Sequence, residues 1–224
     1  MCGRFNLIDS PQVQWLCEVL GVPLPSAHLR ADIAPGSHIA IIHQDGDKRR
    51  TSEAIWWLLL DPKTAKPNYR YASFNSRSDK LHQPRAAAFH PYRESRCLIP
   101  ASAFVEGLGD KKTYYRIELE GSAIAFGGVY RRYVNQETGE TVLGASIVTL
   151  PPLPQWQEIH PKSMPLMLDF DNTELIEKWL DPTFDRVEEF APLLEPKVEK
   201  TMKVTPIDRP STWNPIAESF LIVA

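Results

Sequence analysis

The sequence predicts one α+β domain over residues 2–224. We expect mainly antiparallel strands, in a barrel-like or sandwich-like arrangement, with a few peripheral helices. Three observations predict this class. Apolar or alternating segments of strand length dominate the chain after residue 96. The 20 prolines and 11 glycines among 224 residues are typical of many short elements joined by turns. Neither a repeat nor a long linker divides the sequence.

The first predicted element is a helix that begins after Ser10. Serine is a favourable N-cap, and Pro11 suits the first helical position. Apolar residues recur at helical spacing from Val13 to Leu20, and Gly21 ends the pattern. Between this helix and residue 96, we predict strands at residues 38–43, 51–60 and 69–74, a turn at 45–47 between the first two, and a helix at 79–89 that contains Pro84.

Strand patterns dominate the rest of the chain until two helices near its end. The predicted strands are residues 97–99, 104–105, 113–119, 123–130, 141–150 and 197–204, with a short buried run at 164–168. Asp171 and Glu174 have the spacing of a capping box, which predicts a helix over residues 175–180. Thr183 is the expected cap of a second helix that ends at residue 194.

Charge and hydropathy exclude several classes of protein. The net charge of −3 argues against a protein that coats nucleic acid with its whole surface. Residues 1–100 nevertheless hold 13 Lys and Arg against 9 Asp and Glu, a net charge of +4 that allows a local basic face. No apolar run is long enough to span a membrane, and no signal peptide is recognisable. We therefore expect a cytoplasmic protein that does not bind membranes.

The three cysteines differ in their expected roles. Cys17 lies on the apolar face of the predicted helix and Cys97 in an apolar run, so both are expected in the core. Their number and spacing favour neither a disulfide framework nor a cysteine-rich zinc site, and we expect no metal or cofactor. Cys2 would become the N-terminal residue if Met1 were removed, as is usual before a small residue.

An N-terminal cysteine carries an amine and a thiol on adjacent carbons. The amine can form an imine with an aldehyde, and the thiol can then close a five-membered thiazolidine ring. Because the pKa of an α-amine is about 7.7–8.0, roughly a tenth of it is neutral at pH 7, far more than for lysine. The dipeptide alone is also compatible with a cysteine that is second in the chain by chance.

Five segments, in order, resemble one protein family. They are Cys2-Gly3-Arg4-Phe5, Ala34-Pro35-Gly36, Phe74-Asn75-Ser76-Arg77-Ser78-Asp79, the run from Arg96 to Ala101 with Phe104-Val105-Glu106, and Ile159-His160-Pro161 with Met164-Pro165-Leu166-Met167-Leu168. Together they resemble the SOS-response-associated peptidases (SRAP), which act on abasic DNA. The resemblance implies a mostly β fold and a covalent link between the N-terminal cysteine and the ring-opened aldehyde of an abasic site in single-stranded DNA. It leaves open lyase activity through the imine.

The resemblance also implies roles for particular residues. Cys2 would be the nucleophile, Asn75 would orient the sugar or the linkage, Glu106 would act as acid or base, and His160 would move protons. The chemistry suits these side chains, because imine formation needs a proton removed from the amine and water expelled from a carbinolamine. For each, the ordinary alternative is a turn residue, a solvated carboxylate or a core histidine.

Two arginines are expected to bind DNA. Arg4 and Arg77 can hold flanking phosphates through paired N–H donors. By contrast, residues 48–50 (Lys-Arg-Arg) begin a predicted strand and are better interpreted as a solvated edge than as a DNA contact.

The sequence departs from the family pattern at four places, one of which is Trp213-Asn214-Pro215, a loose match to the family's late asparagine segment. Residues 56–61 lack the glycine, the proline and the second tryptophan of the family's W-G-L-I-P-x-W segment, which puts base stacking there in doubt. Asp32 stands near the position of an asparagine, and Lys162 replaces an arginine before Met164 without its bidentate geometry. We therefore expect a family member that retains the residues of the proposed chemistry but contacts DNA through different side chains.

Three functions are compatible with these features. The first is a monomeric enzyme of the DNA-damage response that crosslinks itself through Cys2 to abasic sites in single-stranded DNA. The second is an N-terminal-nucleophile thiol peptidase or amidohydrolase in which the amine of Cys2 is the base for its own thiol. The third is a single-strand binding module without catalysis, which would bind in a salt-dependent way and be indifferent to Cys2.

Overall fold

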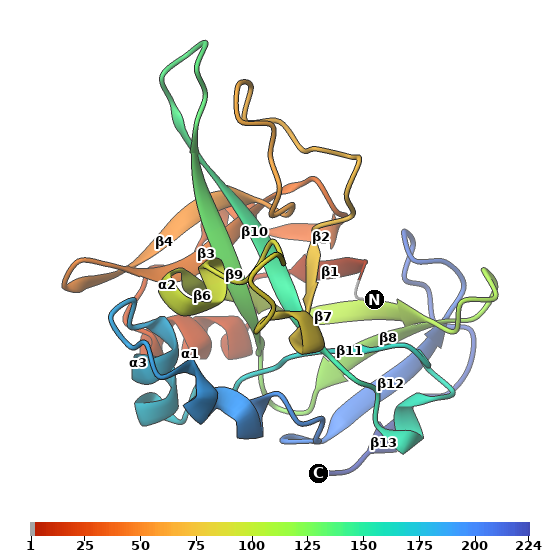
Figure 1. Ribbon diagram of the computed structural model, residues 1–224. Coiled ribbons are helices and arrows are strands. Elements are labelled where there is room, and N and C mark those ends of the chain that lie inside the picture. The colour runs from red at the N-terminus through yellow and green to blue at the C-terminus, as the bar shows by residue number, and fades with distance from the viewer. Residues whose placement is uncertain (1–2) are drawn as a thin grey trace.

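The computed structural model describes residues 3–224 and has the predicted α+β class, with strands as its main component and short helices at the periphery (Figure 1). The strands form two sheets of seven and six strands. All pairings are antiparallel among the described strands except those of β10 with β4 and with β5.

The seven-stranded sheet closes on itself. Its order is β11-β10-β4-β3-β6-β9, with β5 also beside β10, and β9 pairs back onto β10. Strands β10, β4, β3, β6 and β9 therefore form a five-stranded barrel, which removes the exposed edges of an open sheet. The bounds are β3 (His38–Asp45), β4 (Lys48–Ile55), β5 (Asn75–Arg77), β6 (Arg96–Ala101), β9 (Ile124–Val134), β10 (Thr141–Leu150) and β11 (Met164–Pro165).

The six-stranded sheet lies beside this barrel in the order β13-β12-β8-β7-β1-β2. Strand β1 lies between β7 and β2, so the first strand of the chain is internal to its sheet. The bounds are β1 (Arg4–Leu7), β2 (Arg30–Ile33), β7 (Ala103–Gly107), β8 (Tyr114–Leu119), β12 (Met202–Ile207) and β13 (Phe220–Ile222).

Short helices cover the outside of the strands. The α-helices are α1 (Pro11–Val19), α2 (Pro91–Glu94) and α3 (Thr173–Leu180), and the 3₁₀ turns are η1 (Ser26–His28), η2 (Ser78–Lys80), η3 (Pro154–Trp156) and η4 (Val187–Leu193). Helix α1 is capped as predicted, because Ser10 accepts a hydrogen bond from the amide of Val13 at 3.3 Å. No helix among residues 3–224 is both long and apolar enough to cross a bilayer.

Several sequence predictions were wrong in this outer layer. Residues 69–74 form a loop, and the strand begins at Asn75; residues 79–89 contain only η2 and turns, which fits the difficulty posed by Pro84. Asn172 caps α3 in place of Asp171, since its side chain accepts from the amide of Leu175. The segment after Thr183 is the 3₁₀ turn η4, with a proline inside it, rather than an α-helix.

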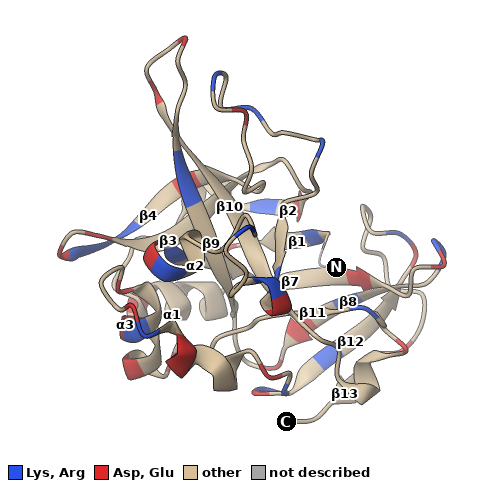
Figure 2. Cartoon of the chain, viewed as in Figure 1, with Lys and Arg blue, Asp and Glu red and all other residues tan. Residues whose placement is uncertain are grey.

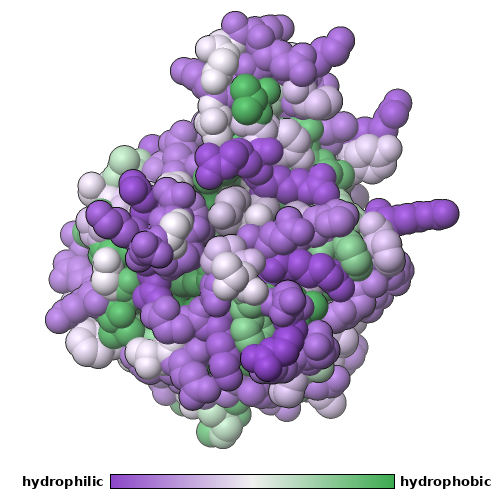
Figure 3. All heavy atoms as spheres, turned by 60° about the vertical axis from the view of Figure 1, so that its left-hand side comes forward, coloured by the Kyte–Doolittle hydropathy of each residue, from purple (hydrophilic) through white to green (hydrophobic). Residues whose placement is uncertain are grey.

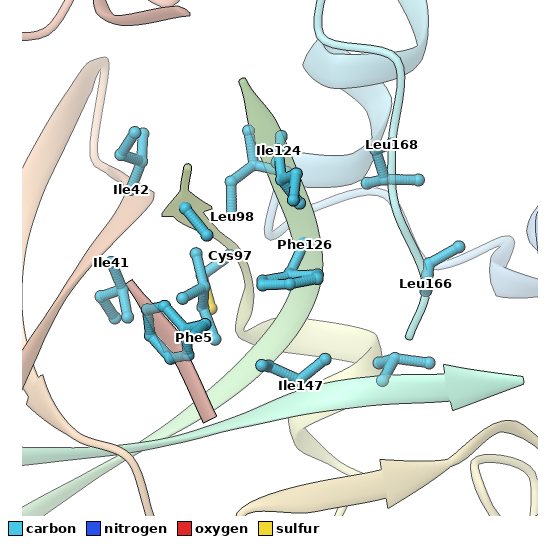
Figure 4. Packing of buried hydrophobic residues seen from close by; sticks show 14 of the residues in the cluster. Phe5, Ile41, Ile42, Cys97, Leu98, Ile124, Phe126, Ile147, Leu166 and Leu168 are labelled. Atoms are coloured by element: carbon cyan, nitrogen blue, oxygen red, sulfur yellow. The ribbon is translucent and has the colours of Figure 1, made fainter. Parts of the chain in front are cut away.

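One large core joins the two sheets. It includes Phe5 from β1, Cys97 from β6, Phe126 from β9 and Ile147 from β10, all at most 1% exposed and gathered between the strands (Figure 4). Phe5 packs edge-on against Phe126, with ring centroids 6.0 Å apart. Cys17 and Cys97 are buried as predicted, and burial raises the pKa of both thiols. The face drawn in Figure 3 is mostly hydrophilic, with hydrophobic residues in small separate groups.

A long loop projects from the barrel between β4 and β5. It lies beside the β9–β10 hairpin, the uppermost feature of Figure 1, and the amide of Gln136 in that hairpin donates to the carbonyl of Lys63 at 2.8 Å. Figure 2 shows several basic residues along this loop, which contains Lys63, Lys66 and Arg70. The loop is therefore basic and is held by the hairpin.

Candidate active site

Glu106 is a buried carboxyl at the end of an internal strand. It belongs to β7, and its side chain is 1% exposed. In the β1–β7 register Arg4 faces Val105, so continuing the register brings Glu106 beside residue 3. Burial raises the pKa of Glu106 to about 7. The carboxyl is thus poised to take or give a proton near neutral pH.

His160 lies directly against this carboxyl. Its Nδ1 is 3.8 Å from Oε2 of Glu106 and 2.6 Å from the carbonyl oxygen of Gly107. A carbonyl can only accept a hydrogen bond, so Nδ1 carries the proton and Nε2 is the basic nitrogen of the neutral ring. Burial lowers the pKa of His160 despite the hydrogen bond to Gly107, which favours this neutral form.

Trp156 fixes the segment that carries His160. It is fully buried and stacks on Phe104 at 6.3 Å between ring centroids. Its carbonyl accepts the amide of His160 at 2.8 Å, and its indole N–H donates to the carbonyl of Ser163 at 3.1 Å. Because Phe104 lies two residues before Glu106 on the same strand face, one packed unit positions both titratable groups.

Asn75 and Arg77 lie on β5, on the other sheet. Asn75 faces Ile147 of β10 and Arg77 faces Thr149, and side-chain Oδ1 of Asn75 is buried. Since residues two apart point to the same side of a strand, the side chains of Asn75 and Arg77 share one face. The guanidinium of Arg77 is exposed and makes two hydrogen bonds to the carboxylate of Asp79, at 2.9 and 2.8 Å.

Arg4 is part of a different cluster. It forms a salt bridge with Asp32 of β2, and Asp32 accepts the indole N–H of Trp213 at 3.2 Å. Arg4 faces Val105, which packs in a small apolar cluster with Trp213. Strand alternation therefore places Arg4 and Glu106 on opposite faces of the six-stranded sheet. Asp32, where the sequence departs from the family pattern, is therefore bound by Arg4 and Trp213.

The tryptophans of the divergent segment are core residues. Trp56 is fully buried and Trp57 is 7% exposed. Their indole N–H groups donate to backbone carbonyls of Phe74 and Asn68, at 2.9 and 3.1 Å. Both rings are therefore engaged in packing, and the exposed aromatic side chains of this region are instead Tyr69 and Tyr71.

The structure brings some predicted site residues together. It joins Glu106 and His160 directly, and it places Asn75 with Arg77 on one strand face. Cys2 lies outside the described residues. The carbonyl of Gly107 and the Asp32–Trp213 pair are additional site features, and of these the carbonyl of Gly107 carried no signal in the sequence. Within residues 3–224, no three His, Cys, Asp or Glu side chains are grouped so as to hold a metal ion.

The comparisons with known proteins agree with this fold. The model of the family "SOS response associated peptidase (SRAP)" matches residues 1–210, so the chain belongs to that family. The comparison with curated proteins finds no match. Among solved structures, a protein from Bordetella bronchiseptica is similar, with a TM-score of 0.72 and 19% identity over 93% of this chain and 100% of that one.

Two further structures share the fold. A protein from Bacteroides thetaiotaomicron has a TM-score of 0.73 and 21% identity, over 93% of each chain. A phage-related protein from Bordetella bronchiseptica has a TM-score of 0.65 and 20% identity, over 96% of this chain and 99% of that one. These likenesses concern the fold. Family membership associates the chain with the SOS response and with a peptidase-like or DNA-processing class.

Proposed function

We propose that this protein captures abasic sites in single-stranded DNA by a covalent link to Cys2, exposed by removal of Met1. The observation that carries the proposal is the buried Glu106–His160 pair at the end of β7 that neighbours the start of β1. Strand β1 begins at Arg4, two positions after Cys2 in the sequence, and it pairs with β7, the strand that carries Glu106.

The reaction needs only the groups already named and the sugar aldehyde. The neutral amine attacks the aldehyde carbon to give a carbinolamine, which loses water to form an imine. The thiol sulfur then adds to the imine carbon, the thiol proton passes to the nitrogen, and a thiazolidine ring results. The product is the sum of protein and DNA less one water, and neither oxidant nor reductant is consumed.

The buried pair suits the proton transfers of this sequence. A carboxyl whose pKa is about 7 can accept the proton that the α-ammonium must lose before the amine attacks, and can donate one to the departing hydroxyl. The neutral His160 ring offers basic Nε2 while Nδ1 stays bound to the carbonyl of Gly107. Asn75 can hydrogen-bond sugar hydroxyls without adding charge.

The test is a denaturing gel with an oligonucleotide that contains one abasic site. We expect a stable DNA-linked band with the mature protein, an intact mass that starts at Cys2, and loss of the stable band for Cys2→Ala. An oligonucleotide with a tetrahydrofuran in place of the aldehyde is the matched control and should give no band. Undiminished crosslinking by Cys2→Ala would refute the assignment.

The family description favours a second candidate, a thiol peptidase that uses Cys2. The same amine would then deprotonate its own thiol, and an acyl-enzyme would form and be hydrolysed. A panel of amide substrates separates the two proposals, since a peptidase turns over whereas capture of the aldehyde leaves a persistent adduct. Strand cleavage through the imine would appear in the same gels as a shortened oligonucleotide.

A further inference from the structure

A buried histidine of the barrel makes a hydrogen bond to a serine hydroxyl, away from the site already described. His43 belongs to β3 and is 3% exposed. Its ring packs against Tyr130 of β9, with ring centroids 5.0 Å apart. Both ring nitrogens have partners: Nε2 lies 2.8 Å from Oγ of Ser52 on β4, and Nδ1 lies 3.1 Å from the carbonyl oxygen of Gln44.

The carbonyl of Gln44 fixes which ring nitrogen carries the proton. A carbonyl only accepts hydrogen bonds, so Nδ1 is the donor, and Nε2 of the neutral ring accepts the hydroxyl proton of Ser52. Burial lowers the pKa of His43, which keeps this ring neutral and basic at neutral pH. The hydroxyl of Tyr130 lies 3.3 Å from the same Nδ1, where its oxygen can only accept. Its own proton is therefore directed to another acceptor.

This arrangement has the three parts of an activated hydroxyl nucleophile. They are a hydroxyl, a base within hydrogen-bond reach of it, and a third group that orients the base. Here they are Oγ of Ser52, Nε2 of His43 and the carbonyl of Gln44. Burial raises the pKa of Tyr130, so its phenol stays protonated and can donate to the negative oxygen that develops when an acyl group is attacked.

The strand that carries Ser52 has an open edge. Strand β4 pairs with β3 along its whole length but with β10 only where Ile55 meets Gly144. Residues 48–54 therefore have no strand partner on the β10 side among the described strands. Alternate residues of such an edge direct their N–H and C=O groups outward, where they can bind a ligand. Ser52 is only half-buried, so its hydroxyl lies within reach of this edge.

The charges around His43 favour an anionic ligand. Besides burial, the nearby Arg132 and Arg50 lower the pKa of His43, and Asp45 acts in the opposite direction. Arg50 is paired with Asp45 at 3.1 Å. Arg132 is exposed and lies two positions after Tyr130, on the same face of β9. A guanidinium so placed can bind a carboxylate through paired N–H donors.

We infer that Ser52 and His43 form a second reactive site, a nucleophile–base pair that hydrolyses small esters bearing a negative charge. Oγ bonds to the acyl carbon while its proton passes to Nε2, and that proton leaves with the alcohol. Water, deprotonated by the same nitrogen, then releases the acid from the acyl-serine, so one ester and one water give one acid and one alcohol. The site shares no residue with Glu106 and His160, and it does not depend on Cys2.

Diisopropyl fluorophosphate tests the nucleophile, because an activated serine oxygen bonds to its phosphorus with loss of fluoride and a proton. We expect peptide mapping to place the adduct on Ser52 in the folded protein and not in urea. Ser52→Ala should lose the adduct, and His43→Gln should form it about 10²–10⁴-fold more slowly. Thr51→Val is the matched control, because it removes the neighbouring hydroxyl of β4, on the opposite strand face, and should label like the wild type.

The pH dependence of labelling does not need a variant. The wild-type rate should rise as His43 loses its proton, with a midpoint below the ordinary pKa of 6.5. A folded wild type in which Ser52 stays unlabelled, or whose labelling rate has no such midpoint, would overturn the inference. So would equal rates for the wild type and a folded His43→Gln variant.

Two esters test the substrate class: neutral 4-nitrophenyl acetate and the anionic 4-nitrophenyl hydrogen succinate. Activity is counted as the part that Ser52→Ala loses. The wild type should prefer the anionic ester by about tenfold in kcat/KM, and Arg132→Gln should lose this preference. Arg131→Gln is the matched control, since Arg131 is the neighbour on β9 that points to the opposite face. No preference in the wild type, or an equal loss in both variants, would overturn the assignment of an anionic substrate.

Discussion

Nδ1 of His160 lies 3.8 Å from Oε2 of Glu106 while it donates its proton to the carbonyl of Gly107 at 2.6 Å. Burial raises the pKa of the carboxyl and lowers that of the imidazole. Both shifts favour the neutral forms, which avoids two buried charges. The pair can therefore exchange protons with a bound amine or hydroxyl near pH 7 at little electrostatic cost.

The first prediction concerns stability and pH. A carboxyl whose pKa rises from 4.5 to about 7 on folding stabilises the protein fully below pH 4.5, and this contribution is lost as the pH rises through 7. Relative to Glu106→Gln, which stays neutral, the wild type should lose on the order of 3 kcal/mol between pH 4.5 and 8. Urea unfolding at several pH values measures this difference. A constant difference across that range would contradict the raised pKa.

The second prediction concerns the rate of crosslinking. His160→Ala removes a positioned acid–base group, so the rate with abasic DNA should fall by about 10²–10⁴-fold. The wild-type rate should also fall on acidification, because protonation removes the basic Nε2. Single-turnover gels from pH 5 to 8 provide the measurement, and binding of tetrahydrofuran DNA should change little. Loss of binding in step with rate would assign His160 to DNA affinity instead.

The third prediction concerns Asp32. Asp32→Asn removes a negative charge beside Arg4 and keeps an oxygen that can accept the indole N–H of Trp213. Single-stranded DNA should bind several-fold more tightly at low salt, with a steeper dependence of affinity on salt by roughly 0.7 in logarithmic slope. Asp45→Asn is the control, since Asp45 pairs with the distant Arg50. Equal salt slopes for Asp32→Asn and the wild type would disprove the effect.

The hydrophobic pattern located the barrel strands, although the strand predicted at residues 51–60 ends at Ile55 in β4, and it predicted the connections poorly. Strand β10 was predicted with its observed bounds, because a buried strand of ten residues leaves a clear apolar signal. Strand β1 was missed: four residues with only Phe5 and Leu7 buried carry too little periodicity. Residues 69–74 alternate like a strand, yet the backbone there forms a loop whose position depends on contacts with Trp57.

The candidate site, too, was predicted from the sequence only in part. Residue type and family resemblance pointed to Glu106, His160 and Asn75, and the structure joins the first two. The stacking of Trp156 on Phe104 holds the segment of His160 against β7, and these two rings come from residues about 50 positions apart. Sequence patterns are local, so they do not show which residues far apart in the chain come into contact. The role of Asp32 as partner of Arg4 and Trp213 could not be foreseen for the same reason.

The fourth prediction concerns Arg96, which is 2% exposed. Its guanidinium donates to the carbonyls of Tyr92 and Arg93 at the end of α2, and to those of Trp179, Asp181 and Phe184 at and after the end of α3. Arg96→Met should destabilise the protein by about 3–5 kcal/mol, because these carbonyls lose a charged donor at two helix C-termini.

The comparison for Arg96 is an exposed arginine. Arg50→Met removes a salt bridge with Asp45 whose side chains are more than half exposed, and should change the unfolding free energy by less than about 1 kcal/mol. Arg96→Lys should be intermediate, since an ammonium has three donors in place of five. Urea unfolding of the three variants provides the test. An effect of Arg96→Met no larger than that of Arg50→Met would mean that the carbonyls find other donors.

The last prediction concerns Gly144, where β10 meets β4 in the barrel. A Cβ atom at this position would lie 2.5 Å from the carbonyl oxygen of Trp57 and 3.0 Å from that of Leu58. Both obstacles are backbone atoms of the segment that leads into the basic loop, so Gly144→Ala must displace that segment or open the barrel. We expect destabilisation of about 1–3 kcal/mol, typical of an overpacked site.

Gly127→Ala is the matched control for this change. Its added methyl group would meet the Leu166 side chain at 2.6 Å, and a side chain can rotate away where a backbone carbonyl cannot. Gly144→Ala should therefore be the more destabilising of the two in urea unfolding, and should also weaken binding of tetrahydrofuran DNA through the displaced loop. If the two substitutions destabilise the protein equally, the backbone at residues 57–58 must move away from β10 as readily as the Leu166 side chain rotates.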